Sequence, residues 1–208
     1  MTRVKICGIT DPADLDVVVS AGADAVGFTV DVSVDTPREI EPDRAAELVS
    51  ATPPFVTTVL VTMPETTDGA LESIEHIQPD VIQVHGRLSP EELETLAGDT
   101  HSDVVKAVSP EDAARFDTVA DALLVDSLDA SGAGGTGETH DWDRTHELVS
   151  SLGSPVILAG GLTTENVADA VERVHPFAVD VASGVESQPG RKDPDAVRSF
   201  VRRAGARP

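Results

Sequence analysis

A single cysteine is the first residue of this chain that could do chemistry. Cys7 is the only cysteine among 208 residues, so neither an internal disulfide nor a cluster of thiolate ligands for zinc can form. It stands where an apolar run meets a glycine, in Lys5-Ile6-Cys7-Gly8-Ile9-Thr10. Such a thiol could act as a base if neighbouring dipoles or Lys5 lowered its pKa. Free cysteines are also common as small buried apolar residues.

Asp126 is a candidate proton donor. It follows the apolar run Ala122-Leu123-Leu124-Val125 and is the first polar group after it. A carboxyl group that is partly desolvated has a raised pKa and can hold a proton to donate. With a basic thiol nearby it would form an acid–base pair. The alternative is that this aspartate only caps a loop.

Glycines follow the last two apolar runs of the chain and suggest an anion site. Backbone N–H groups in such turns can approach an anion closely, and a helix start near Ser183 would add partial positive charge. The pattern predicts a phosphate site that needs no lysine, unless these glycines only form turns. Its residues are Gly160, Gly161, Ser183 and Gly184.

These candidates stand at the ends of apolar runs that alternate with segments of helical period. The expected strands are Val4–Cys7, Ala25–Phe28, Phe55–Val61, Val81–Val84, Val104–Ala107, Ala122–Val125, Val156–Leu158 and Ala178–Val181. The expected helices are Asp11–Ala21, Pro42–Ala51, Thr67–Ile77, Pro90–Ala97, Pro110–Phe116, Trp142–Leu152, Thr164–Val174 and Pro194–Ala204. Strands that are apolar on both faces and are joined by helices belong to parallel sheets.

Eight such strand–helix units predict an α/β fold, a single (β/α)8 TIM barrel that forms one domain over residues 1–208. Right-handed crossovers close into a barrel at eight units, and the active site then lies at the carboxyl ends of the strands. An open doubly wound sheet would show a glycine-rich turn after its first strand, and Cys7-Gly8-Ile9-Thr10-Asp11 is not such a turn.

The composition describes the environment of the protein more than its reaction. The net charge is −22, from 15 Lys+Arg against 37 Asp+Glu, and this negative field disfavours nucleic acid and anionic membranes as partners. The acidic residues are spread along the chain, as in proteins from a salt-saturated cytoplasm, so we expect a halophilic source. No run approaches the ~20 apolar residues of a membrane span, and the chain begins without a signal-peptide pattern. We expect a cytoplasmic protein.

Several motifs together resemble the phosphoribosylanthranilate isomerase family of tryptophan biosynthesis. They are Lys5–Thr10, Gly22–Phe28, Thr36–Ile40, Gln83–Gly86, Leu124–Ser127, Gly134–Gly137, Leu158–Leu162 and Asp180–Glu186. The resemblance runs from Val4 to about Phe200 and follows the family order. It implies an Amadori rearrangement of N-(5-phosphoribosyl)anthranilate to the 1-deoxyribulose 5-phosphate derivative, without cofactor or metal.

The same resemblance assigns roles to particular residues. Asp126 is the general acid that opens the sugar ring, Cys7 is the general base, and Arg38 holds the anthranilate carboxylate, a task that suits a guanidinium fork. Lys5, His85 and Asp180 are candidates for a supporting layer, with His85 structural rather than catalytic. The expected partner is a small phosphorylated substrate, and the expected assembly is a monomer or homodimer.

Two other functions compete with this interpretation. One is the histidine-pathway isomerase, which performs the analogous rearrangement on a larger substrate with two phosphates; Cys7, Arg38 and the lack of a second glycine-rich grip after strands three and four argue against it. The other is a non-catalytic phosphate-binding barrel, which would have no need of both Cys7 and Asp126.

Overall fold

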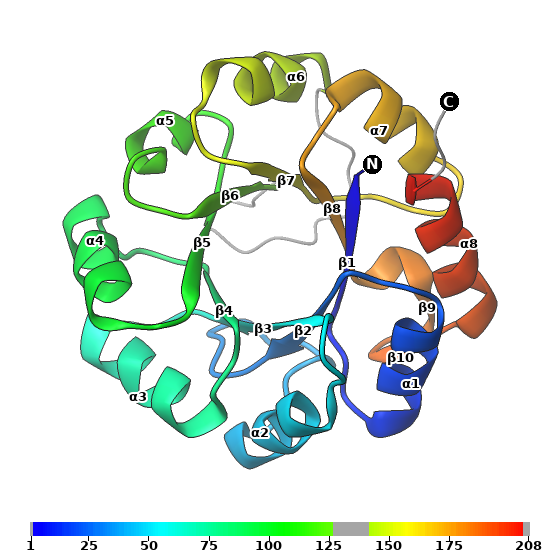
Figure 1. Ribbon diagram of the computed structural model, residues 1–208, viewed down its shortest axis with the longest axis horizontal. Coiled ribbons are helices and arrows are strands. Elements are labelled where there is room, and N and C mark those ends of the chain that lie inside the picture. Colours follow the sequence, from blue (N-terminus) through cyan, green and yellow to red (C-terminus); the bar gives the residue numbers. More distant parts are fainter. Residues whose placement is uncertain (1, 127–141, 206–208) are drawn as a thin grey trace.

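Eight parallel strands close into a barrel in the computed structural model, which describes residues 2–126 and 142–205 (Figure 1). The strands follow one another around the ring in chain order, and β8 closes the ring by pairing with β1. The helices lie outside the ring, as Figure 1 shows. The predicted TIM barrel is therefore confirmed.

The elements alternate as the sequence predicts. The barrel strands are β1 (Arg3–Cys7), β2 (Ala25–Thr29), β3 (Thr57–Thr62), β4 (Val81–Val84), β5 (Asp103–Val108), β6 (Ala122–Val125), β7 (Val156–Leu158) and β8 (Ala178–Val181). The helices are α1 (Pro12–Ser20), α2 (Pro42–Ala51), α3 (Thr67–Ile77), α4 (Pro90–Asp99), α5 (Ala113–Phe116), α6 (Trp142–Ser151), α7 (Val167–Val174) and α8 (Pro194–Gly205). A 3-10 turn, η1 (Ser183–Val185), follows β8 and begins where the sequence predicts a helix start, near Ser183. A hairpin of β9 (Glu186–Gln188) and β10 (Arg191–Lys192) comes next, and the sequence patterns did not predict it.

Several boundaries differ from the prediction by one to three residues, and two of these differences have a clear local reason. Strand β3 begins at Thr57 rather than Phe55, because Phe55 has a φ of 72° and stands fully exposed after two prolines. Helix α5 is reduced to Ala113–Phe116, because the residues before it form a turn in which the Asp112 N–H donates to Ser109 O.

Side-chain caps fix several helix starts. The Asp11 carboxylate accepts from the N–H groups of Ala13 and Asp14 before α1, and Ser89 forms a reciprocal capping box with Glu92 before α4. Glu41, just before α2, makes no such hydrogen bond.

Two apolar layers hold the barrel together. The larger one lies between strands and helices and includes Ile6, Val104 and Leu123. The smaller one contains residues of the opposite strand faces, among them Cys7 and Leu124. Since successive residues of a strand point to opposite faces, Cys7 is turned inward as its neighbour Ile6 is turned outward.

Three aspartates fasten pairs of consecutive strands at the amino-terminal end of the barrel. Each stands just before an even-numbered strand, and its Oδ2 accepts a hydrogen bond from a backbone N–H of the strand before, at 2.8 Å. The acceptor–donor pairs are Asp24–Val4, Asp80–Thr58 and Asp121–Val104. We call these contacts the aspartate clips.

None of the described helices is long and apolar enough to cross a membrane.

Candidate active site

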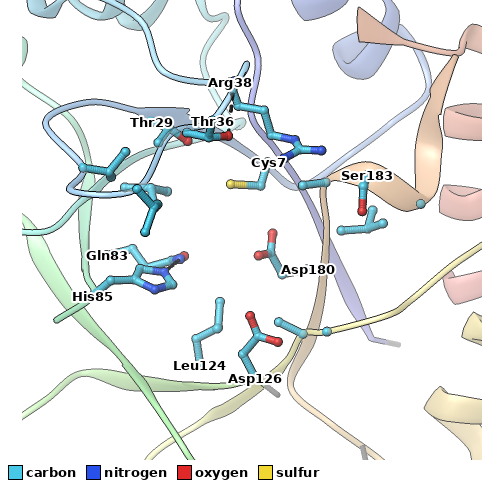
Figure 2. Close-up of a pocket in the computed structure, with 18 of the residues that line it drawn as sticks. Cys7, Thr29, Thr36, Arg38, Gln83, His85, Leu124, Asp126, Asp180 and Ser183 are labelled. Atoms are coloured by element: carbon cyan, nitrogen blue, oxygen red, sulfur yellow. Dashed lines mark hydrogen bonds between the residues drawn. The ribbon is translucent and has the colours of Figure 1, made fainter. Parts of the chain in front are cut away.

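A cavity of about 390 Å³ lies at the carboxyl ends of the barrel strands and collects nearly every residue that the sequence singled out. Cys7, Arg38, Asp126 and Asp180 contribute to its wall, together with the glycine turns after β7 and β8. Figure 2 shows Cys7, Asp126, Asp180 and His85 around one central space. Residues 126 and 7 are far apart in the chain, and the closed sheet brings them to the same cavity.

Cys7 ends β1 and is 8% exposed. It pairs in register with Gly27 of β2, and a Cβ on Gly27 would lie only 2.8 Å from the Cys7 Sγ. The glycine therefore provides the space in which the thiol sits. The sequence motifs do not indicate this contact, because it depends on the register between β1 and β2.

Burial raises the pKa of the Cys7 thiol above its usual range, and Asp180 acts in the same direction. The positive charges of Lys5 and Lys192 lower that pKa but do not outweigh burial. The expectation of a lowered pKa at Cys7 was therefore wrong, because the loss of thiolate hydration raises this pKa more than the two ammonium groups lower it.

Lys5 and Asp180 form a buried ion pair beside Cys7. The Lys5 Nζ donates to Asp180 Oδ1 at 2.8 Å, and the lysine side chain is 5% exposed. Burial disfavours the charged form of Lys5, but attraction to Asp180 and Cys7 outweighs it and raises the pKa of the lysine. Lys5 is thus held as an ammonium next to the candidate base, and a supporting role for Lys5 and Asp180 stays a prediction.

Asp126 follows β6 and is 6% exposed. Its backbone N–H donates to Val108 O at 3.3 Å, which ties the end of β6 to β5. In Figure 2 its carboxyl group points toward the same space as Asp180. The role of Asp126 as proton donor stays a prediction.

Arg38 lies at the rim of the cavity, and its guanidinium is already engaged. Its Nε and Nη2 donate to the two carboxylate oxygens of Glu186, both at 2.8 Å. The hydrogen bond to Glu186 is the main reason why the pKa of Arg38 is raised further above its ordinary value. Lys192 holds the same carboxylate, with Nζ 2.9 Å from Glu186 Oε1.

The glycine turns have the backbone that a close anion contact requires. Gly160 and Gly161 have φ of 86° and 62°, in the left-handed region that favours glycine. A Cβ on Gly184 would fall 1.9 Å from Leu162 O, so no side chain fits there. The Asn166 side chain donates to Gly161 O at 2.9 Å and fixes the first turn. Ser183 opens η1 beside it.

His85 lies in the cavity wall next to Gln83. The two side chains approach at 2.8 Å between Gln83 Nε2 and His85 Nε2. Burial, followed by the charges of Lys106 and Lys5, lowers the pKa of His85 to about 3. The imidazole is therefore neutral near pH 7, and the Gln83 amide donates to its unprotonated nitrogen. Among the described residues, no three His, Cys, Asp or Glu side chains are grouped as metal ligands.

Comparison with known proteins identifies the family. A family model described as N-(5'-phosphoribosyl)anthranilate (PRA) isomerase matches residues 4–203. The chain belongs to this family. N-(5'-phosphoribosyl)anthranilate isomerases from Natronomonas pharaonis and Haloarcula marismortui are 64% and 59% identical to it, over at least 98% of each chain. Among solved structures, the phosphoribosyl anthranilate isomerase of Thermotoga maritima has a TM-score of 0.86 and 37% identity, with 98% of each chain covered.

Another solved phosphoribosyl anthranilate isomerase holds reduced 1-(o-carboxyphenylamino)-1-deoxyribulose 5-phosphate; it has a TM-score of 0.83 and 36% identity to this chain, with 98% of each chain covered. The close relatives from halophilic archaea agree with the acid-rich composition of this isomerase family member.

Sequence analysis did not single out Gln83, Glu186 or Lys192 as site residues. The one signal in the sequence was the rarity of lysine, since the chain has only three. In the structure all three are buried: Lys5, Lys106 and Lys192. Ser127 and the segment Gly134–Gly137, which formed part of the resemblance to the isomerase family, lie outside the described residues.

Proposed function

We propose that this chain converts N-(5'-phosphoribosyl)anthranilate to its 1-deoxyribulose 5-phosphate isomer in tryptophan biosynthesis, with Asp126 as acid and Cys7 as base. The observation that carries the proposal is that both groups face one cavity, with a guanidinium and a pair of glycine turns in its wall. We also propose that the whole chain is one domain that works in the cytoplasm as a monomer or homodimer.

The reaction begins with opening of the sugar ring. Asp126 gives its proton to the ring oxygen as the bond from that oxygen to the anomeric carbon breaks, and the amine nitrogen supplies the electron pair that forms a protonated Schiff base. The Asp126 carboxyl group is 6% exposed and lies in the cavity wall, so it is sheltered from solvent where the ring oxygen would bind.

The second step moves a proton from carbon. The Cys7 thiolate removes the proton from the sugar carbon next to the Schiff base, and the electrons of that C–H bond neutralise the iminium to give an enolamine. Protonation at the former anomeric carbon and loss of the enol proton give the ketone. Reactant and product are isomers, so the steps redistribute protons and need no electron donor or acceptor.

Charge placement supports one orientation of the substrate. The free N–H groups of Arg38 suit a planar carboxylate, and the backbone at Gly161, Ser183 and Gly184 suits a phosphate. The Lys5 ammonium near Cys7 favours the thiolate that the second step needs, against the opposing effect of burial.

Growth rescue of a tryptophan auxotroph that lacks this isomerase, in a host with high internal salt, tests the activity. In a purified assay that follows anthranilate fluorescence, Cys7→Ser and Asp126→Asn should each lose most of their turnover while they still bind the reduced product. The exposed substitution Glu47→Gln is the control. Failure of rescue by the folded wild-type protein contradicts the activity, and a rate within about threefold of wild type in either variant removes that residue from the mechanism.

A further inference from the structure

Arg38, Glu186 and Lys192 form a continuous chain of charges behind the rim of the cavity. Arg38 and Glu186 are 148 positions apart in sequence, and Glu186 and Lys192 face each other across the β9–β10 hairpin. The side chains of Glu186 and Lys192 are 4% and 0% exposed, while that of Arg38 is 24% exposed. Only the arginine end of the chain therefore reaches the cavity.

The carboxylate of Glu186 takes one edge of the guanidinium and leaves the other free. It accepts from Nε and from one N–H of Nη2. A guanidinium has three further N–H groups, two on Nη1 and one on Nη2, and none of these donates to a residue that the structure describes. These form the end-on fork that binds a planar carboxylate through two parallel hydrogen bonds.

The backbone holds this pair from both sides. A Cβ on Gly8 would lie 2.6 Å from Arg38 Cδ, so the stem of the arginine passes directly over the glycine. The Gly190 N–H donates to Glu186 Oε2 at 3.3 Å. Lys192 is fixed in turn, because its Nζ also donates to Ala182 O at 3.2 Å and its backbone N–H donates to Asp14.

The three charges sum to a single positive charge at the rim. Burial disfavours the Glu186 carboxylate, but hydrogen bonds from Arg38 and Lys192 outweigh this effect and lower its pKa. Glu186 therefore remains charged near neutral pH. Without Lys192, the carboxylate would cancel the arginine charge that a substrate anion needs.

We propose that Glu186, held by Lys192, is a positioning residue that aims the free edge of Arg38 at the carboxylate of the substrate. The proposal rests on the proposed function, since it refines how the aromatic end of that substrate is recognised. It predicts that Glu186 affects only ligands that carry the carboxylate, and only while Arg38 is present.

Two ligands and a double-mutant cycle test this role. Calorimetry measures binding of reduced 1-(o-carboxyphenylamino)-1-deoxyribulose 5-phosphate and of the same compound without its carboxyl group. Glu186→Gln should weaken the first ligand about tenfold or more, the change expected for the loss of one charge-assisted hydrogen bond, and the second less than about twofold. In the Arg38→Ala background, Glu186→Gln should have no further effect on either ligand.

Folding and substrate turnover provide the controls. Glu186→Gln leaves the buried Lys192 without its carboxylate, so the double variant Glu186→Gln/Lys192→Met, which removes both charges, is measured alongside it and should show the same ligand selectivity. Glu186→Asp should recover part of the affinity. Glu47→Gln breaks an exposed pair with Arg44 and should change neither ligand.

The outcomes separate this inference from the proposed function. If the folded wild type binds neither ligand, the proposed function is wrong. If the wild type binds both, and Glu186→Gln weakens both equally or acts independently of Arg38, then Glu186 is only structural and the inference is overturned.

Discussion

Replacement of Gly27 by alanine tests whether the position of the Cys7 thiol limits catalysis. The new methyl group would lie 2.8 Å from Cys7 Sγ, 3.2 Å from Cys7 Cα and 3.2 Å from Lys5 Cε. Ordinary contacts are roughly 3.5–4.0 Å, so the sulfur must move by about 1 Å. The contact with Cys7 Cα limits escape by simple rotation of the thiol. Gly27 does not have a positive φ, so alanine adopts an ordinary backbone conformation at residue 27 and the effect comes from these three close contacts.

A displacement of this size should lower kcat about 100-fold, because a catalytic group misplaced by ~1 Å loses its near-attack geometry. That change corresponds to about 2.7 kcal/mol of activation free energy. Overpacking should also cost about 1–3 kcal/mol of stability. The assay follows anthranilate fluorescence under saturating substrate, and urea unfolding measures the stability.

Gly98→Ala is the matched control. Gly98 lies in α4, and nothing lies within 4 Å of the position that its new methyl group would take. Alanine there should therefore leave kcat unchanged and raise stability by up to about 1 kcal/mol. A Gly27→Ala enzyme that keeps kcat within about twofold, in a folded protein, would show that the position of the thiol is not critical and would refute this reasoning.

Three other perturbations have definite signs. Arg38→Ala should weaken binding of the reduced product by roughly 1.5–3 kcal/mol and leave binding of inorganic phosphate unchanged in titrations; equal losses would place Arg38 at the phosphate end. Lys5→Met should move the acid limb of the kcat/KM profile to higher pH, because the rate rises as Cys7 loses its proton and the Lys5 charge lowers the pKa of Cys7. An acid limb that does not move would show that Lys5 does not affect the ionisation of Cys7. The Debye length falls from ~30 Å at 0.01 M to ~3 Å at 1 M salt. Because the net charge of the chain is −22, its Tm should therefore rise with potassium chloride, and Glu91→Gln/Glu94→Gln should make that rise smaller. A Tm that does not change with salt would contradict charge repulsion.

The barrel was predictable because its information is local and repeated. Each strand is a short apolar run, each helix has its own period, and the count of eight sets closure. The cavity candidates Cys7 and Asp126 followed from their places after strands. Arg38 came from the resemblance alone, since nothing about its spacing indicates a cavity wall.

What the sequence could not supply depends on distances across the fold. The sign of the Cys7 pKa shift was wrong because burial depth is a property of the closed barrel and not of the motif around the thiol. Glu186 and Lys192 were missed because they act in a short hairpin after β8, where no periodicity marks the turn. The contact between Gly27 and Cys7 requires the β1–β2 register.

The aspartate clips divide the first six strands of the barrel into two-strand modules. Each clip joins an odd-numbered strand to the next even-numbered one, through Asp24, Asp80 and Asp121. Among the described residues, no aspartate side chain joins β2 to β3 or β4 to β5 in this way. A chain opened between β4 and β5 would thus keep every clip within one fragment or the other, whereas an opening between β3 and β4 would separate Asp80 from Thr58. Fragment complementation and circular permutation should accordingly succeed at the first kind of break and fail sooner at the second, so the base of the barrel determines where the chain tolerates new ends.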